Sequence, residues 1–137
     1  KASRLKFCIV PRGDAVEAAS RVKPLLARAL AHGGTHGFHD LQKDLGAGQA
    51  QLWLAWDGNG PQAAAVTTIT NYPLYTECLV WLCAGDGRDG WLHGLEGIEA
   101  WAKGQGCATV AIQGRAGWKR VLDGYSKKAV LLEKRLT

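Results

Sequence analysis

The sequence contains no long hydrophobic run. No apolar stretch approaches the roughly 20 residues of a membrane-spanning helix, and residues 5–10 are too few and too interrupted to be the hydrophobic part of a signal peptide. Internal repeats, low-complexity segments and interdomain linkers are also absent. We therefore expect a soluble, cytoplasmic protein that forms one domain over residues 1–137 and has no membrane partner.

The sequence has only a small excess of positive charge, and it has few cysteines. The chain has 17 basic and 12 acidic residues, a net charge of +5, and the basic residues are scattered. This balance suits an anionic partner such as a phosphorylated cofactor, but it is not a signature of nucleic-acid binding. The cysteines fall in predicted strands among apolar neighbours, so we expect buried, free thiols at Cys8, Cys78, Cys83 and Cys107.

The hydrophobic pattern predicts alternating strands and helices. Asp14 and Glu17 resemble a capping box at the start of the first helix, and Pro24 predicts a kink or a break within it. Further helices are expected over residues 38–45, 91–103 and 118–122, and strands over 5–10, 51–56, 63–70, 77–84, 108–113 and 129–133. The order predicts an α/β fold: a single domain with a mixed sheet of about six to seven strands and helices on both faces.

The stretch from Glu77 to Gln113 organises the chain. A continuously apolar strand is followed by a glycine-rich loop over residues 85–90, an amphipathic helix and a second apolar strand. Such a loop lets backbone N–H groups approach a phosphate, and the helix N-terminus adds positive potential. The alternative is a plain connection in which Asp89 caps the helix and the glycines turn the chain.

The order of elements, with its glycine loop after the fourth strand, resembles the GCN5-related N-acetyltransferase (GNAT) fold. Residues 116–125 look like the helix of that family that leads into its leucine-Gly-Phe turn. Residues 101–107 and 114–118, with the Leu-Glu-Lys-Arg-Leu sequence near the end, are further similar to small acetyltransferase-like proteins of tailed bacteriophages.

The resemblance implies that acetyl-CoA binds where the fourth and fifth strands splay apart, here after Ala84. Its pantetheine arm would pair with the fourth strand, and its pyrophosphate would lie on the glycine loop. Of the family's loop residues, Arg88 and Gly90 match in kind, whereas Trp91 stands where the family usually has a small residue. The implied cofactor contacts are Leu82, Cys83, Ala84, Gly87, Arg88, Asp89, Gly90 and Trp91.

Acetyl transfer also needs a base to take a proton from the incoming ammonium group. Glu77 and His93 are the candidates, with an exposed strand-end carboxylate and a solvated helix-face residue as their structural alternatives. The tyrosine that often protonates the leaving thiolate in the family lies about one helical turn before the Gly-Phe pair. Arg120 stands near that place, and Tyr125 replaces the turn aromatic, so we expect Tyr125 to pack.

Three histidines precede the first sheet hairpin: His32, His36 and His39, beside Asp40. Their spacing is too loose for a metal motif, so we expect no metal ligands, and the polar loop that they form is placed where acceptors enter in the family. The sequence supports two candidate functions. The first is an N-acetyltransferase acting on a small-molecule or protein amine by direct attack. The second is a non-catalytic phage protein, a virion, assembly or host-interacting component with a viral or host protein partner.

Overall fold

A computed structural model of the chain describes residues 6–85, 94–113, 122 and 124–136. The sheet strands are β1 (Phe7–Ile9), β2 (Gln51–Asp57), β3 (Gly60–Asn71), β4 (Thr76–Gly85) and β5 (Thr109–Ile112). The helices are α1 (Arg12–Arg21), α2 (Lys23–Gly33), α3 (Phe38–Gly46) and α5 (Leu95–Gly104). In the described part no helix is long and apolar enough to cross a bilayer.

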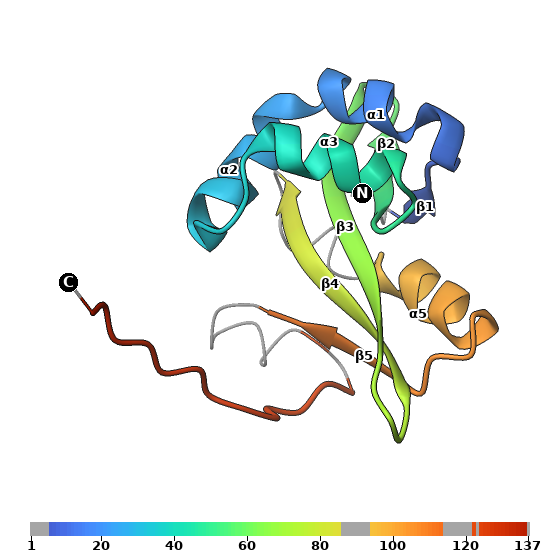
Figure 1. The fold of residues 1–137 in the computed structure, drawn as a ribbon. Helices are drawn as coiled ribbons and strands as arrows, with labels where there is room; N and C mark the ends of the chain where they lie inside the picture. The colour runs from blue at the N-terminus through green and yellow to red at the C-terminus, as the bar shows by residue number, and fades with distance from the viewer. Residues whose placement is uncertain (1–5, 86–93, 114–121, 123, 137) are drawn as a thin grey trace.

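The strands form one mixed sheet in the order β1-β2-β3-β4-β5. The first four are antiparallel to their neighbours, and β4 and β5 are parallel. Helices α1, α2 and α3 cover one face of the sheet, and α5 lies on the other (Figure 1). The predicted α/β architecture with helices on both faces is therefore confirmed.

Two cores lie on the two faces of the sheet, because side chains alternate along each strand. In β2, Leu52 and Leu54 point to one face and Trp53 and Ala55 to the other. The α5-side core is built on Phe7, Trp53, Ala55, Ala63, Ala65, Cys78, Val80, Leu95, Ile98, Ala102 and Leu122. The three-helix-side core is built on Ala15, Ala19, Val22, Leu26, Leu30, Leu41, Leu45, Ala50, Leu52, Leu54, Ala64, Val66 and Leu82.

The predicted number of strands is not confirmed, because the described residues form five. The expected strand over residues 129–133 is extended chain that pairs with no strand of the described residues, and Leu131 and Leu132 are 88% and 87% exposed. Its apolar composition is that of a strand, but a strand also needs a partner, which the described part of its own chain does not supply. The expected helix over residues 118–122 lies outside the described residues except for the buried Leu122.

The first helical region differs from the prediction at its start and agrees with it in the middle. Helix α1 begins at Arg12, two residues before the predicted cap, so Asp14 lies in its first turn. The helix ends at Arg21, and α2 begins at Lys23 with Pro24 in its first turn. Proline is tolerated there because the N–H that it lacks has no partner within the helix, and the predicted break is confirmed.

One expectation about a buried side chain is wrong. Cys8 is exposed, because it lies on the opposite face of β1 from the buried Phe7. Trp56, at the end of the predicted strand over residues 51–56, is 55% exposed, because the pairing of β2 with β3 shifts register between Ala55 and Trp56. Such an irregularity interrupts the regular alternation of side chains by which Trp53 is buried. The other three cysteines are buried or half-buried, and all four are free thiols.

Candidate functional site

Strands β4 and β5 separate in the middle of β4. They pair only from Glu77 opposite Thr109 to Val80 opposite Ile112, whereas β4 continues to Gly85. Among the described residues, Trp81–Gly85 therefore has a neighbour on the β3 side only. Within the described ranges no residue pairs with the backbone N–H and C=O groups on its other edge, and an extended ligand with amide groups is able to pair with them. The described pairing ends at Val80, four residues before Ala84, after which the separation was expected.

A β-bulge coincides with the point of separation. Val66 of β3 lies opposite Leu82, but the next residue, Thr67, lies opposite Val80, so Trp81 is the extra residue of β4. Trp81 and Leu82 consequently both pack on the three-helix side, although neighbours in a regular strand alternate. Bulges bend and twist the strand that carries them. The bulge thus gives a local cause for the divergence of β4 from β5.

A buried hydrogen-bonded chain holds β2 and β3 together beside the bulge. The Trp53 indole Nε1 donates to Thr67 Oγ1 at 3.0 Å, and this hydroxyl donates to Gln51 Oε1 at 2.9 Å. Thr67 is fully buried. Because each of these buried polar groups has a partner, the network fixes the register of β3 against β2. It does so at Thr67, where the pairing of β3 with β4 changes register.

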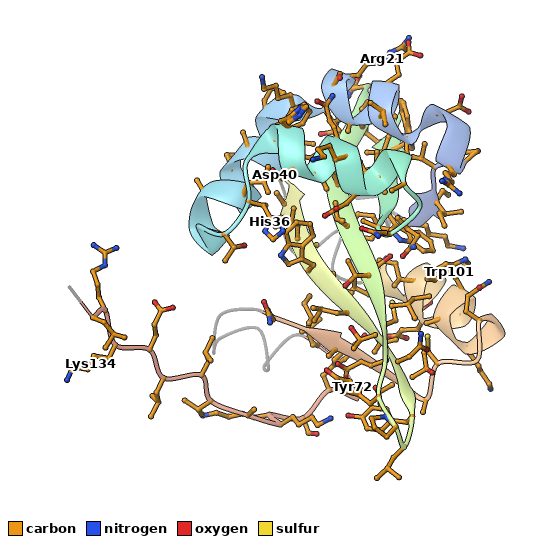
Figure 2. All side chains as sticks on the ribbon, in the orientation of Figure 1. Arg21, His36, Asp40, Tyr72, Trp101 and Lys134 are labelled. Atoms are coloured by element: carbon orange, nitrogen blue, oxygen red, sulfur yellow. The ribbon has the colours of Figure 1, made fainter. Side chains whose placement is uncertain are left out.

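The connection between α2 and α3 covers the bulge from one side. The rings of His36 and Trp81 meet edge to face, with centroids 4.7 Å apart and planes at 70°. Figure 2 shows His36 beside the upper part of β4, close to Asp40. The connection is ordered by hydrogen bonds from Gly37 N to Asp40 Oδ2 at 2.9 Å and between His36 and Thr35 at 2.8 Å. The histidine-bearing loop therefore borders the open part of β4.

Two hollows meet at His36. The larger, about 470 Å³, is lined by α2, the connection and Phe38; the smaller, about 300 Å³, is lined by polar residues, among them Asp40, Lys43 and Asp44. His39 is exposed on α3, and the side chain of His32 lies outside the described part. No three histidine, cysteine, aspartate or glutamate side chains of the described ranges are grouped as metal ligands would be.

Some of the predicted cofactor residues lie together on the open stretch. Leu82 is buried, and Cys83 and Ala84 are half-buried. Gly85 ends β4 where it comes very close to β3: a Cβ there would lie 2.5 Å from the Cβ of Ala63 and 2.8 Å from a backbone oxygen of β3. The close approach of the two strands therefore requires this glycine. The other predicted contacts, Gly87, Arg88, Asp89, Gly90 and Trp91, and the predicted base His93 lie outside the described residues.

The other predicted base, Glu77, lies at the paired end of β4. It is 8% exposed, so the alternative of an exposed carboxylate is wrong. Its Oε2 accepts a hydrogen bond from Thr109 Oγ1 at 3.1 Å and lies 3.8 Å from Lys128 Nζ. At about 3.3 Å per residue, Glu77 is about 13 Å along the strand from Trp81. These contacts tie β5 and the chain after Gly124 to β4, and they keep Glu77 away from the open stretch.

Three thiols, one of them on the open stretch, have raised pKa values. Burial, with smaller contributions from Cys107 and Glu77, raises the pKa of Cys78 to about 11. Burial also raises the pKa of Cys83 and that of Cys107. The reactive form of cysteine is the thiolate, so a raised pKa lowers the reactivity of these thiols at neutral pH. The site is therefore unsuited to a covalent acyl-cysteine on these residues.

Tyr125 packs against the α5-side core, as predicted. Its hydroxyl donates to Glu99 Oε2 at 2.7 Å, and burial together with this carboxylate raises the pKa of Tyr125 well above its usual value. The hydroxyl therefore links the chain after residue 124 to α5.

Comparisons with known proteins support the fold. No protein-family model matches the chain, and no curated protein sequence matches it. Solved structures do match. An aminoglycoside acetyltransferase from an uncultured soil metagenomic sample, crystallised with sisomicin, has 13% identity and a TM-score of 0.71, with 97% of each chain covered. A GNAT family acetyltransferase from Staphylococcus aureus has 13% identity and a TM-score of 0.67, covering 97% of this chain and 99% of that one.

Glucosamine-6-phosphate N-acetyltransferase from Arabidopsis thaliana has 12% identity and a TM-score of 0.64, covering 98% of this chain and all of the other. Identities this low support the architecture and no more. Together with the parting of β4 from β5, they show that the chain has the fold of the GCN5-related N-acetyltransferases.

Proposed function

We propose that the protein is an N-acetyltransferase that moves an acetyl group from acetyl-CoA to an amine. The observation that carries this proposal is the open edge of β4 over Trp81–Gly85. A pantetheine arm contains two amides, so it can form the backbone hydrogen bonds that a neighbouring strand would otherwise form. The acetyltransferases that share the fold add support.

In this proposal the backbone of Leu82, Cys83 and Ala84 holds the arm of the cofactor. The adjoining residues Gly87, Arg88, Asp89, Gly90 and Trp91 are proposed to hold its phosphates. When bound, acetyl-CoA supplies an acetyl thioester whose carbonyl carbon is open to attack by an amine. In this proposal the bulge at Trp81 bends β4 away from β5, and the buried hydrogen bond to Thr67 beside it stabilises the bulge.

We propose a small-molecule amine as the acceptor. The similar structures include one crystallised with the aminoglycoside sisomicin and one named for glucosamine-6-phosphate, both of which carry amino groups on a sugar. In this chain the polar hollow beside His36 offers the carboxylates of Asp40 and Asp44 to an ammonium group. A protein amine is the alternative acceptor, and competition between a lysine peptide and an amino sugar for acetylation separates the two.

Direct transfer within a ternary complex fits the protonated thiols of Cys78 and Cys83 better than a covalent intermediate does. His93 and Glu77 stay proposed bases, and the contacts of Glu77 with Thr109 and Lys128 favour a positioning role for it. The pH profile of kcat/KM distinguishes the roles. If the residue is the base, its replacement by glutamine should remove the acidic limb of the profile. If it is a positioning residue, the same replacement should lower the plateau of kcat/KM and keep the limb.

Titration with acetyl-CoA while tryptophan fluorescence is followed tests the proposal. Trp81 lies at the start of the open edge, so we expect a saturable change and a raised Tm. Trp81→Phe should remove most of the fluorescence change, and Trp56→Phe, on the exposed end of β2 two strands away, should keep it. Neither a fluorescence change nor a thermal shift in the wild type would reject the proposal.

The second candidate is a non-catalytic protein of the same fold that binds another protein, including the phage or host partners expected from the sequence. The apolar side chains exposed after Lys128 favour it. Absence of acetyl-CoA binding together with saturable binding of a protein partner would select it over the transferase.

A further inference from the structure

Under the proposed function, on which this inference rests, a base for the acceptor ammonium has to lie close to the open edge of β4. It must be within hydrogen-bond reach of the proton that it takes, directly or through one water. Glu77 lies about 13 Å along the strand from Trp81. Its carboxylate also contacts Thr109 and Lys128 at the paired end of β4. A titratable group beside Trp81 is therefore better placed for this step.

His36 places an imidazole beside Trp81. Its ring meets the indole edge to face, with centroids 4.7 Å apart, and Figure 2 shows it next to the upper part of β4. Trp81 is the extra residue of the bulge and comes directly after Val80, where the described pairing of β4 with β5 ends. His36 therefore contacts the first residue of the open edge.

One nitrogen of the His36 ring is held and the other is available. Nδ1 lies 2.8 Å from Thr35 Oγ1, in hydrogen-bond contact. With the Nδ1 proton donated to this hydroxyl, the lone pair of the neutral ring is on Nε2. In the part of the chain that the structure describes, no group hydrogen-bonds to Nε2, and the residue is exposed. A substrate or a bridging water can therefore reach this nitrogen.

The charges that face His36 favour an ammonium group. On the α3 side, the smaller hollow is lined by Asp40, Lys43 and Asp44. With His36 neutral, two carboxylates against one ammonium give this hollow a net negative charge, which attracts a cation. On the α2 side, the described residues that line the larger hollow do not titrate: Ala27, Leu30 and Ala31. An acceptor ammonium that enters the smaller hollow therefore lies beside His36.

We propose that His36 is the general base of the transfer. Its Nε2 takes one proton from the acceptor ammonium, and the amine nitrogen so formed attacks the carbonyl carbon of the acetyl thioester. As the carbon–nitrogen bond forms and the carbon–sulfur bond breaks, a second proton passes from the nitrogen to the leaving sulfur. The imidazolium then releases its proton to water. The ammonium and acetyl-CoA are thereby converted into an amide, the CoA thiol and one free proton.

The pH dependence of kcat/KM tests the assignment, with glucosamine and a lysine peptide as the probe amines. A histidine changes its charge between about pH 5 and 8, so the wild type is expected to show an acidic limb in that range. His36→Gln should lose this limb and lower the plateau of kcat/KM at least about 100-fold. The matched control is His39→Gln, because His39 is exposed on α3 and lines neither hollow. It should keep the wild-type profile.

Chemical rescue distinguishes a base from a positioning residue. Added imidazole should raise the activity of His36→Ala at least about tenfold, in proportion to the concentration of neutral imidazole, and should not raise that of His39→Ala. Thr35→Val removes the hydroxyl in contact with Nδ1 and leaves the base in place, so it should lower kcat and keep the acidic limb. Because these side chains are exposed, each variant should keep the wild-type Tm.

These outcomes are separable from failure of the proposed function. His36→Gln should bind acetyl-CoA with the wild-type Kd in the fluorescence titration. If the wild type acetylates a probe amine but His36→Gln keeps the acidic limb, or imidazole gives no rescue, the base is not His36 and the transferase stands. Loss of the limb in His93→Gln alone would likewise move the assignment to His93. A wild type that binds acetyl-CoA but acetylates neither probe overturns this proposal, and one that does not bind acetyl-CoA rejects the proposed function as well.

Discussion

Replacing Thr67 by valine tests whether the buried network beside the bulge stabilises the sheet. Valine has nearly the same shape, so packing in the fully buried position is kept and both hydrogen bonds are lost. The Trp53 indole N–H then has no acceptor, and its side chain is only 2% exposed. Burying an unsatisfied donor costs about 1–3 kcal/mol, whereas the half-exposed Gln51 can return to water at little cost.

We therefore expect the free energy of unfolding to fall by about 2 kcal/mol in Thr67→Val, which is a Tm lower by roughly 6–8 °C for a chain of this size. Urea unfolding followed by circular dichroism measures the first quantity and calorimetry the second. Thr68→Val, at the neighbouring half-buried position, is the control and should stay within about 0.5 kcal/mol of the wild type. In a double-mutant cycle, Trp53→Phe should cost less in the Thr67→Val background than alone. A loss below about 0.5 kcal/mol in Thr67→Val would refute the reasoning.

Three further predictions concern packing and titration. Gly97→Ala should destabilise the protein, since the added Cβ would lie 2.8 Å from the Phe7 carbonyl oxygen: overpacking costs about 1–3 kcal/mol against a gain of about 1 kcal/mol in helix propensity. The unhindered Gly104→Ala serves as the control in the same thermal melts, and a Tm that rises in Gly97→Ala would contradict the close contact. Mass spectrometry after brief alkylation at neutral pH should find the exposed Cys8 modified before the buried Cys78, and the reverse order would refute the assigned burial. The free energy of unfolding should fall as the pH rises from about 8.5 towards 11, because unfolded thiols ionise near 8.5 while folded Cys78, with its pKa raised to about 11, stays protonated. In urea titrations at several pH values, Cys78→Ala should reduce the slope of unfolding free energy against pH. An unchanged slope would count against the raised pKa.

The order of the elements could be predicted from the sequence because its signals are local. Pro24 marks the boundary between α1 and α2, and Gly58, Asn59 and Gly60 mark the hairpin between β2 and β3. Apolar periodicity then separates helices from strands. These features and the glycine-rich loop indicated a resemblance to the GNAT fold, and the solved structures support that fold.

The geometry of the candidate site could not be predicted in the same way, because it depends on pairing between distant residues. β4 is continuously apolar, so nothing in its pattern reveals the bulge at Trp81 or the end of its pairing at Val80. Glu77 is buried through Thr109 and Lys128, which follow it by 32 and 51 residues. Composition predicted a strand over residues 129–133, but composition does not supply the neighbour that a strand needs.

Hydrogen exchange along β4, with and without acetyl-CoA, tests the central claim most directly. In the free protein the outward-facing amides of Trp81–Gly85 should exchange faster than those of Glu77–Val80, which are paired with β5. Acetyl-CoA should slow exchange in Trp81–Gly85 and leave Glu77–Val80 nearly unchanged. Equal protection of both halves in the free protein, or no added protection with saturating acetyl-CoA, would contradict an open edge that binds the cofactor.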